Sequence, residues 1–267
     1  MQVPGKREYA LVSDVYPGGG MLKKWIAAVV LTASLVVTVP TVSAQEKSAV
    51  REGFSAESLN GQKILLFRPS VWVGEQSTAG LPEPNADWTA QARELLNKEL
   101  SRRQREFRNE LVIEPDLVGD EARLFSEHRA LFGSVANSIV NYQFFAGNRL
   151  PTRKNKPFDW TLGEGTKEIA EKTGARYGLF VKTSDQYGSF GRKMFQFLAA
   201  GLVGVGVQSG EHVGYAGLVD LETGNIVWLN ADEKMGGDVR TEDGMQKRVA
   251  QLLEDFPGLK STPLAAE

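Results

Sequence analysis

The chain has 267 residues, a formal net charge of −2, two histidines and no cysteine. Four of its 31 basic residues and two of its 33 acidic residues lie in the first 44 positions, so the remainder has a net charge of −4. This acidic balance argues against non-specific nucleic-acid binding, which needs a basic surface. The missing cysteine is compatible with export. It also leads us to expect no lipid anchor, because a lipoprotein needs a cysteine directly after its leader.

Residues 21–44 have the three parts of a secretory signal peptide. A short basic start at 21–24 precedes an uncharged, mostly aliphatic stretch at 25–39, and Val42 and Ala44 occupy the −3 and −1 positions of a cleavage site. An uncleaved membrane anchor is the alternative, but Thr, Ser and Pro dilute the second half of the uncharged segment. We therefore expect cleavage after Ala44 and export to the periplasm.

The rest of the chain divides around this segment. Met21 suits the start of a signal peptide better than the acidic, turn-rich stretch before it, so we interpret residues 1–20 as a misassigned upstream extension. Behind the signal peptide we expect an N-terminal lead at 45–59, a single α/β domain at 60–256 and a flexible tail at 257–267. A domain of this size buries a substantial core.

The first half of the domain alternates between strands and helices. The expected ranges are a strand at 63–73, a loop at 74–85, a helix at 87–107, a strand at 111–113 and a helix at 120–140. Apolar residues recur at helical spacing in both helices. Asp87 and Asp120 stand where side chains cap a helix.

The second half begins with a polar connection and ends in a hairpin and a helix. The expected ranges are the connection at 147–159, a helix at 162–173, a strand at 176–182, two strands at 213–221 and 226–229, and a helix from Thr241 to Phe256. Thr223 and Gly224 form the structural turn between the last two strands, because glycine supplies the positive φ that such a turn needs. The order predicts an α/β fold: a mixed sheet with helices packed on it, then a C-terminal β-hairpin and a helix.

The segment 194–207 is apolar except for Gln196. It is too short to span a bilayer as a helix. We favour a core or crossover helix; the alternatives are a surface for self-association or partner binding, and shallow membrane contact. The residues of this candidate interaction segment are Met194, Phe195, Phe197, Leu198, Leu202 and Val203.

No motif predicts a catalytic residue, a cofactor site or a metal site. His128 and His212 have no partner at metal-ligand spacing. We expect His128, on the apolar side of its helix, to pack its ring at the edge of the core, and His212 to pair with Glu211 or solvent. Residues 188–191 lack the frame of a serine-hydrolase motif, and the glycines of 201–210 match no dinucleotide or phosphate loop. A pair of carboxylates that meet only in space stays open.

Two local patterns resemble a group of bacterial envelope proteins. One is the helix end and strand at 172–181, and the other is the hairpin at 214–228. Both are similar to stretches in the curli assembly lipoprotein family, the penicillin-binding-protein activator lipoproteins and the N-terminal domain of the Tol-Pal propeller protein. The resemblance implies an α/β domain in the cell envelope, although this chain lacks the acylated cysteine of the lipoprotein members.

These observations predict a non-catalytic periplasmic accessory protein of the bacterial envelope, without a cofactor. Its expected partner is another envelope protein or a second copy of itself, not nucleic acid, and membrane contact is less favoured. Two alternatives stay open: a periplasmic hydrolase with a spatially assembled carboxylate site, and a membrane-associated subunit of an envelope assembly.

Overall fold

The computed structural model describes residues 46–259 except 78, 80, 104–105, 108, 154–155 and 190–209. These residues belong to one compact unit, Ser43–Glu267. The expected signal peptide, the candidate interaction segment and all but the start of the expected tail lie outside the described residues. Within the described part of the chain, none of the helices combines the length and the apolar character that crossing a membrane requires.

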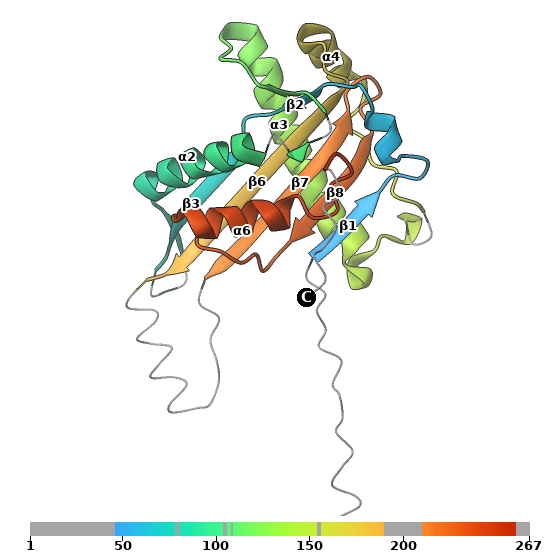
Figure 1. Cartoon of the computed structure of the whole chain (residues 1–267). Coiled ribbons are helices and arrows are strands. Elements are labelled where there is room, and N and C mark those ends of the chain that lie inside the picture. Colours follow the sequence, from blue (N-terminus) through green and yellow to red (C-terminus); the bar gives the residue numbers. More distant parts are fainter. Residues whose placement is uncertain are drawn as a thin grey trace, which may run out of the picture. The chain divides into compact units, whose positions relative to one another are not determined.

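The described strands form one mixed sheet of eight strands (Figure 1). Their bounds are β1 Glu46–Val50, β2 Ile64–Leu66, β3 Ser70–Gln76, β4 Pro82–Pro84, β5 Leu111–Ile113, β6 Tyr177–Gly188, β7 Glu211–Asp220 and β8 Ile226–Asp232. The order is β1-β8-β7-β6-β2-β5, and β3 also pairs with β6 and with β4. β2 is parallel to β5 and β6, and β3 is parallel to β6, whereas β6, β7, β8 and β1 are antiparallel neighbours.

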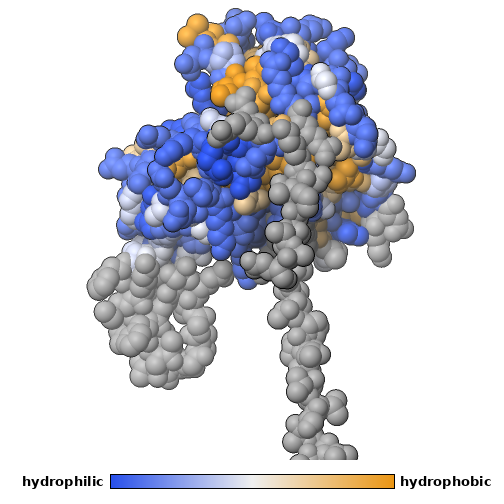
Figure 2. All heavy atoms as spheres, viewed as in Figure 1, coloured by the Kyte–Doolittle hydropathy of each residue, from blue (hydrophilic) through white to orange (hydrophobic). Residues whose placement is uncertain are grey.

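Helices cover both faces of this sheet, which confirms the predicted fold class. Their bounds are α2 Ala86–Arg103, α3 Gly119–Ile139, α4 Lys167–Thr173 and α6 Glu242–Leu252, with a π-helical turn η3 at Val140–Phe144 and short 3-10 turns η1 Ala56–Leu59, η4 Ala146–Asn148, η5 Pro151–Arg153 and η6 Glu164–Thr166. α2 and α6 lie on one face and α3 on the other (Figure 1). The outward surfaces of α2 and α6 are mostly hydrophilic (Figure 2), so their apolar sides face the sheet.

The chain direction explains why α2 and α3 lie on opposite faces. α2 connects the β2–β3 segment to β5 at the sheet edge, and α3 begins the return from β5 across β2 to β6. Connections between parallel strands are right-handed. Two crossovers that run in opposite directions along the sheet therefore place their helices on opposite faces of it. The carboxyl ends of β2 and β5 therefore lie at a topological switch point, where open α/β sheets bind ligands.

Each face of the sheet has its own hydrophobic core. Under α2 and α6 the core includes Leu96, Leu100 and Val249, all at most 1% exposed. Under α3 it contains a ring stack in which Phe180 lies 3.9 Å from Phe67 and 4.4 Å from Phe132, centroid to centroid. Burying each such ring contributes roughly 1.5–3 kcal/mol, so the stack fixes α3 firmly on the sheet.

The strand expected at 63–73 is two strands. Leu66 of β2 pairs with Leu179, and Ser70 of β3 pairs with Lys182. Between these two pairs the β2–β3 segment therefore contains one more residue than β6. Such an extra residue is a bulge, and a proline at position 69 suits it because proline has no N–H for the ladder. The bulge bends the chain where the switch point lies.

The expected loop at 74–85 was also wrong in part. β3 continues to Gln76, and β4 pairs with it in antiparallel register.

The first helix is capped by Asn85, whose Oδ1 accepts a hydrogen bond from the Trp88 N–H at 3.0 Å, and not by Asp87. α3 starts after Val118 without a side-chain cap, so Asp120 lies inside the first turn, where the helix dipole favours an acidic residue.

The ends of the domain differ from the expectation as well. The stretch that the sequence suggested as an N-terminal lead contains β1, which pairs antiparallel with β8 along its whole length. At the other end, Leu259 bridges to Phe107 and packs on the core, so the chain stays ordered past residue 256. Gly174 ends α4 in the left-handed region with φ +66°, and the Thr241 hydroxyl caps α6 by accepting from the Gly244 N–H.

Candidate ligand-binding cleft

A cleft of about 850 Å³ opens at the switch point, between α2 and α3. Its walls come from the bulge that follows β2, from Asp116 just after β5, from α2 and from α3. A second hollow of about 510 Å³ adjoins it and shares Arg68, Pro69, Asn97 and Asp116. The volume lies within the range of small-molecule sites, and the location is the one that the topology favours.

The cleft is lined with more positive than negative charge. Its cations are Arg68, Arg93, Arg129 and Lys182, and Asp116 is the one carboxylate among the described residues that line it. Arg68 pairs with Asp116 at 2.8 Å, and both side chains are exposed. Within the described residues, neither Arg93 nor Lys182 forms an ion pair. The cleft can therefore offer unneutralised cations to an anionic ligand.

Glu114 is a buried carboxylate that holds Arg129 and the backbone of Arg68 in place. Only 4% of its side chain is exposed, and it receives an ion pair from Arg129 and a hydrogen bond of 2.8 Å from the backbone N–H of Arg68. One buried carboxylate thus ties the end of β5 to the bulge and to α3. Glu114 and Asp116 are both paired with arginines of the cleft.

The inner wall of the cleft ends in a tyrosine. Tyr215 is 7% exposed, and its hydroxyl has no hydrogen-bond partner within the described structure. Burial raises the pKa of Tyr215 to about 12, so its phenol stays protonated at neutral pH and can donate. The Lys182 ammonium lies 5.5 Å from the Tyr215 ring centroid. Both groups face the cleft from the α3 side of the sheet.

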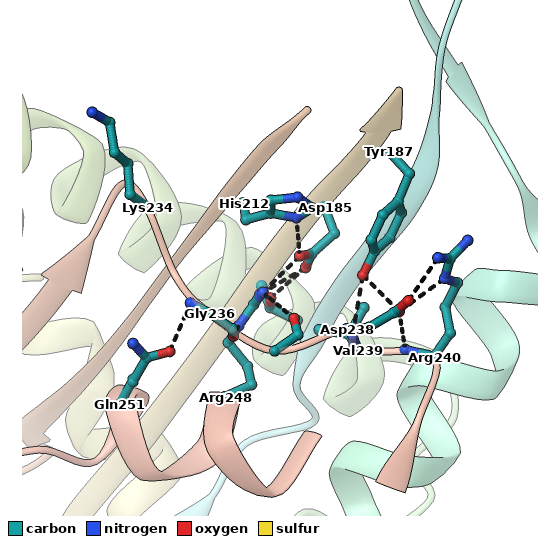
Figure 3. Close-up of polar contacts among 12 residues, drawn as sticks. Asp185, Tyr187, His212, Lys234, Gly236, Asp238, Val239, Arg240, Arg248 and Gln251 are labelled. Carbon is teal, nitrogen blue, oxygen red and sulfur yellow. Dashed lines mark hydrogen bonds and ion pairs between the residues drawn. The ribbon is translucent and has the colours of Figure 1, made fainter. Parts of the chain in front are cut away.

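A buried charged network occupies the opposite face (Figure 3). Arg248 of α6 donates to both oxygens of Asp185 at 2.8 Å and to the Thr183 hydroxyl at 2.6 Å, and all three residues are fully buried. His212 contacts Asp185 through Nδ1 at 2.8 Å. Burial by itself raises the pKa of Asp185, but the hydrogen bonds from His212, Arg248 and Thr183 outweigh it and lower that pKa.

This network corrects the expectation for His212. Its partner is Asp185, directly opposite in the β6–β7 register, and not Glu211 or solvent alone. Because Asp185 remains ionised and its oxygens are held by an arginine, it is a poor base. We interpret the network as structural: it connects α6 to the centre of the sheet.

A second polar cluster in Figure 3 holds the loop before α6. Asp238 accepts from the Tyr187 hydroxyl at 2.9 Å and from two nitrogens of Arg240 at 2.8 and 2.7 Å. The Arg240 guanidinium lies 3.8 Å from the Tyr187 ring centroid and 4.4 Å from that of Trp88. These contacts attach the loop to α2 and to the end of β6.

The residues singled out in the sequence do not line the cleft. Thr223 and Gly224 form the β7–β8 turn, where Gly224 has φ +72° and donates to the Asp220 carbonyl at 2.7 Å. His128 is partly buried, with Nδ1 2.8 Å from the Leu124 carbonyl oxygen. The candidate interaction segment lies outside the described residues. Among the residues described, no three or more His, Cys, Asp or Glu side chains gather in a way that could hold a metal ion.

Sequence reasoning missed the cleft because its cations are far apart in the chain. They come from the bulge, α2, α3 and β6, and none belongs to a motif. One signal was present: Arg68 and Asp116 each follow an apolar strand, and polar residues after parallel strands gather at one edge of a sheet.

The comparisons with known proteins assign this chain to no family. No family model matches the chain, and no curated protein matches it. Among solved structures it is similar to the PelC dodecamer from Paraburkholderia phytofirmans, with a TM-score of 0.36 and 13% identity over 81% of this chain and 98% of that chain. A second PelC dodecamer structure from the same organism gives a TM-score of 0.34 and 12% identity over 80% and 97% of the two chains. At these TM-scores the similarity supports no inference about function.

Proposed function

We propose that this chain is a non-catalytic accessory protein, exported to the bacterial periplasm, that binds an anionic component of the cell envelope in the cleft between α2 and α3. The observation that carries the proposal is the charge of the cleft, where Arg93 and Lys182 have no carboxylate partner in the described structure. Unneutralised cations in a concave site attract and hold oxyanions.

The character of the lining favours binding over catalysis. Arginine forks and side-chain amides recognise carboxylate or phosphate oxygens by geometry. Two carboxylates at the bulge end of the cleft, Glu114 and Asp116, serve as partners for its arginines. A hydrolase would need a base or nucleophile with a free lone pair close to the ligand.

The binding proposal is tested with two anionic probes, tripolyphosphate and trigalacturonate, by calorimetric titration of the mature protein. We expect Arg93→Gln to weaken binding by about tenfold, the loss that follows from one charge-assisted hydrogen bond. Because the attraction is partly electrostatic, wild-type affinity should also fall as salt is raised.

The matched control is Lys247→Gln, which removes the same charge from the exposed surface of α6. It should leave binding within about twofold of wild type. Equal losses in both variants would mean that the net charge, and not the cleft, attracts the probes. No binding of either probe by the wild-type protein would refute the proposed function.

Export is tested separately. Expressed from Met21 in a Gram-negative host, the protein should appear in the osmotic-shock fraction with Gln45 as its first residue, because residues 21–44 have the order of a cleaved signal peptide. N-terminal sequencing checks this. The control Leu35→Arg places a charge in the apolar stretch and should keep the protein inside the cell. Recovery of the unaltered chain only from the cytosol, with residues 21–44 attached, would overturn the export proposal.

A further inference from the structure

A group of large apolar side chains is exposed just beyond the end of α3. Tyr142, Phe145 and Leu150 are 41%, 36% and 40% exposed. They are three of the eight large hydrophobic residues that are exposed within the described structure, and the other five are spread from position 50 to position 131. Single exposed apolar residues are common on protein surfaces. Three within nine positions indicate a surface for contact.

The local backbone turns these side chains outward. Val140 and Phe144, on the inner side of the π-helical turn η3, pack on the hydrophobic core under α3. The Phe145 N–H donates to the Val140 carbonyl at 3.2 Å, and the Asn148 N–H donates to the Phe145 carbonyl at 3.1 Å. The chain after α3 is therefore compact, with an apolar side that faces the core and the exposed ring of Tyr142 on its outer side.

The same stretch is positively charged. Residues 140–158 contain four basic residues and no acidic one, although the chain after residue 44 has a net charge of −4. Arg149 donates through Nε to a carbonyl of η3 at 3.2 Å, which holds its side chain against this turn. Lys156 is exposed, and two further turns, with backbone hydrogen bonds of 2.8 and 3.2 Å, connect it back to Leu150. Within the described residues, neither Arg149 nor Lys156 forms an ion pair. The name α3-end patch is used below for Tyr142, Phe145, Arg149, Leu150 and Lys156.

The α3-end patch is separate from the other polar features of the domain. Carboxylates of the sheet lie on the inner side of η3, where Val140 and Asn141 border a hollow that is also lined by Glu211, Asp232 and Glu233. None of the residues of the patch lines that hollow or the cleft between α2 and α3. The patch is also distinct from the candidate interaction segment, which lies outside the described residues.

We propose that the α3-end patch docks on the surface of a phospholipid bilayer that carries anionic headgroups. Tyrosine and other apolar side chains enter the boundary between headgroups and acyl chains, and lysine and arginine contact the phosphates. Such a surface matches both the apolar side chains and the cations beside them. A twofold pair of this chain would instead place the patch against itself, with cation facing cation. The contact is independent of the ligand in the cleft and goes beyond the proposed function.

The inference is tested by flotation of the mature protein with vesicles. The vesicles contain phosphatidylcholine alone or phosphatidylcholine with phosphatidylglycerol at about a third of the lipid. Wild-type protein should bind the anionic vesicles at least about tenfold more tightly, and raised salt should weaken this binding. Arg149→Gln and Lys156→Gln should each reduce it by roughly fivefold, the effect of one charge near an anionic surface. The double variant Tyr142→Gln with Leu150→Gln should reduce it by about tenfold, because less apolar area enters the lipid.

Matched controls remove the same kinds of side chain elsewhere on the surface. Leu81→Gln replaces another exposed leucine and Lys247→Gln another exposed lysine. Both should leave vesicle binding within about twofold of wild type. Thermal unfolding of every variant separates a loss of binding from a loss of fold. The two charge variants alter exposed ends of long side chains, so they keep the test valid if the apolar double variant melts early.

The outcomes distinguish this inference from the proposed function. Arg93→Gln, in the cleft, should leave vesicle binding unchanged, and the variants of the patch should leave tripolyphosphate binding unchanged. If wild type binds no vesicle, or if the variants of the patch bind anionic vesicles as tightly as wild type, the inference is refuted and the proposed function stands. Vesicle binding that only Arg93→Gln removes would place the headgroup in the cleft and refute the inference. A shift of the variants of the patch to a smaller species by light scattering without lipid would make the patch an interface between copies, and would refute it too.

Discussion

Replacing Arg248 with methionine is expected to lower the free energy of unfolding by about 3–5 kcal/mol, the cost of leaving one partner of a buried ion pair without the other. Asp185 would remain fully buried with only Thr183 and His212 as partners. Methionine keeps much of the volume of the arginine stem, so the loss reports the charge and not a cavity. Urea unfolding followed by far-UV circular dichroism at pH 7 measures it.

Two controls distinguish this interpretation from a general effect of arginine removal. Arg123→Met breaks exposed pairs with Asp120 and Glu127 on α3 and should cost less than about 1 kcal/mol. The double variant Arg248→Met with Asp185→Asn removes both charges and should recover part of the loss. A cost for Arg248→Met as small as that for Arg123→Met would show that the network does not stabilise the fold.

Gly224→Ala is expected to cost roughly 3 kcal/mol, from left-handed strain of about 1–2 kcal/mol and the loss of one or two hydrogen bonds worth about 1 kcal/mol each. Gly224 has φ +72°, and an added Cβ would collide with the backbone of Gly163. The Gly224 carbonyl also accepts from the Leu162 N–H at 2.8 Å and from the Thr161 hydroxyl at 3.0 Å. Relieving the collision would separate these groups.

The matched control is Gly53→Ala. Gly53 has a similar φ of +79°, but an added Cβ would meet nothing within 4 Å. It should therefore cost only the strain of about 1–2 kcal/mol. Chemical unfolding of both variants separates the two contributions. Equal costs at the two positions would mean that the loop at 160–163 adjusts without loss, and that the turn does not depend on its contact with Gly163.

Much of the fold could be predicted from the sequence because its signals are local. The helical spacing of apolar residues in α2, α3 and α6 depends only on near neighbours, and so does the Thr223–Gly224 turn. The errors came where pairing is long-range. β1 and β4 lack a strong strand pattern, and each is a strand because a distant partner, β8 or β3, completes its hydrogen bonds. Asn85 replaced Asp87 as the cap because the helix starts at Ala86, two residues earlier than a cap at Asp87 would place its start.

The sequence by itself determined the α/β class, the hairpin and the amphipathic helices, and it predicts export through residues 21–44. Only the tertiary structure decided which polar residues meet. Arg248 and Asp185 are 63 residues apart in the chain and share one buried contact. The cleft likewise brings together Arg68, Arg93 and Tyr215 from the bulge, α2 and β7. The physical reason is that a charge or a hydroxyl carries no periodic signal of its partner; its environment exists only once the crossovers have placed the helices on the two faces of the sheet.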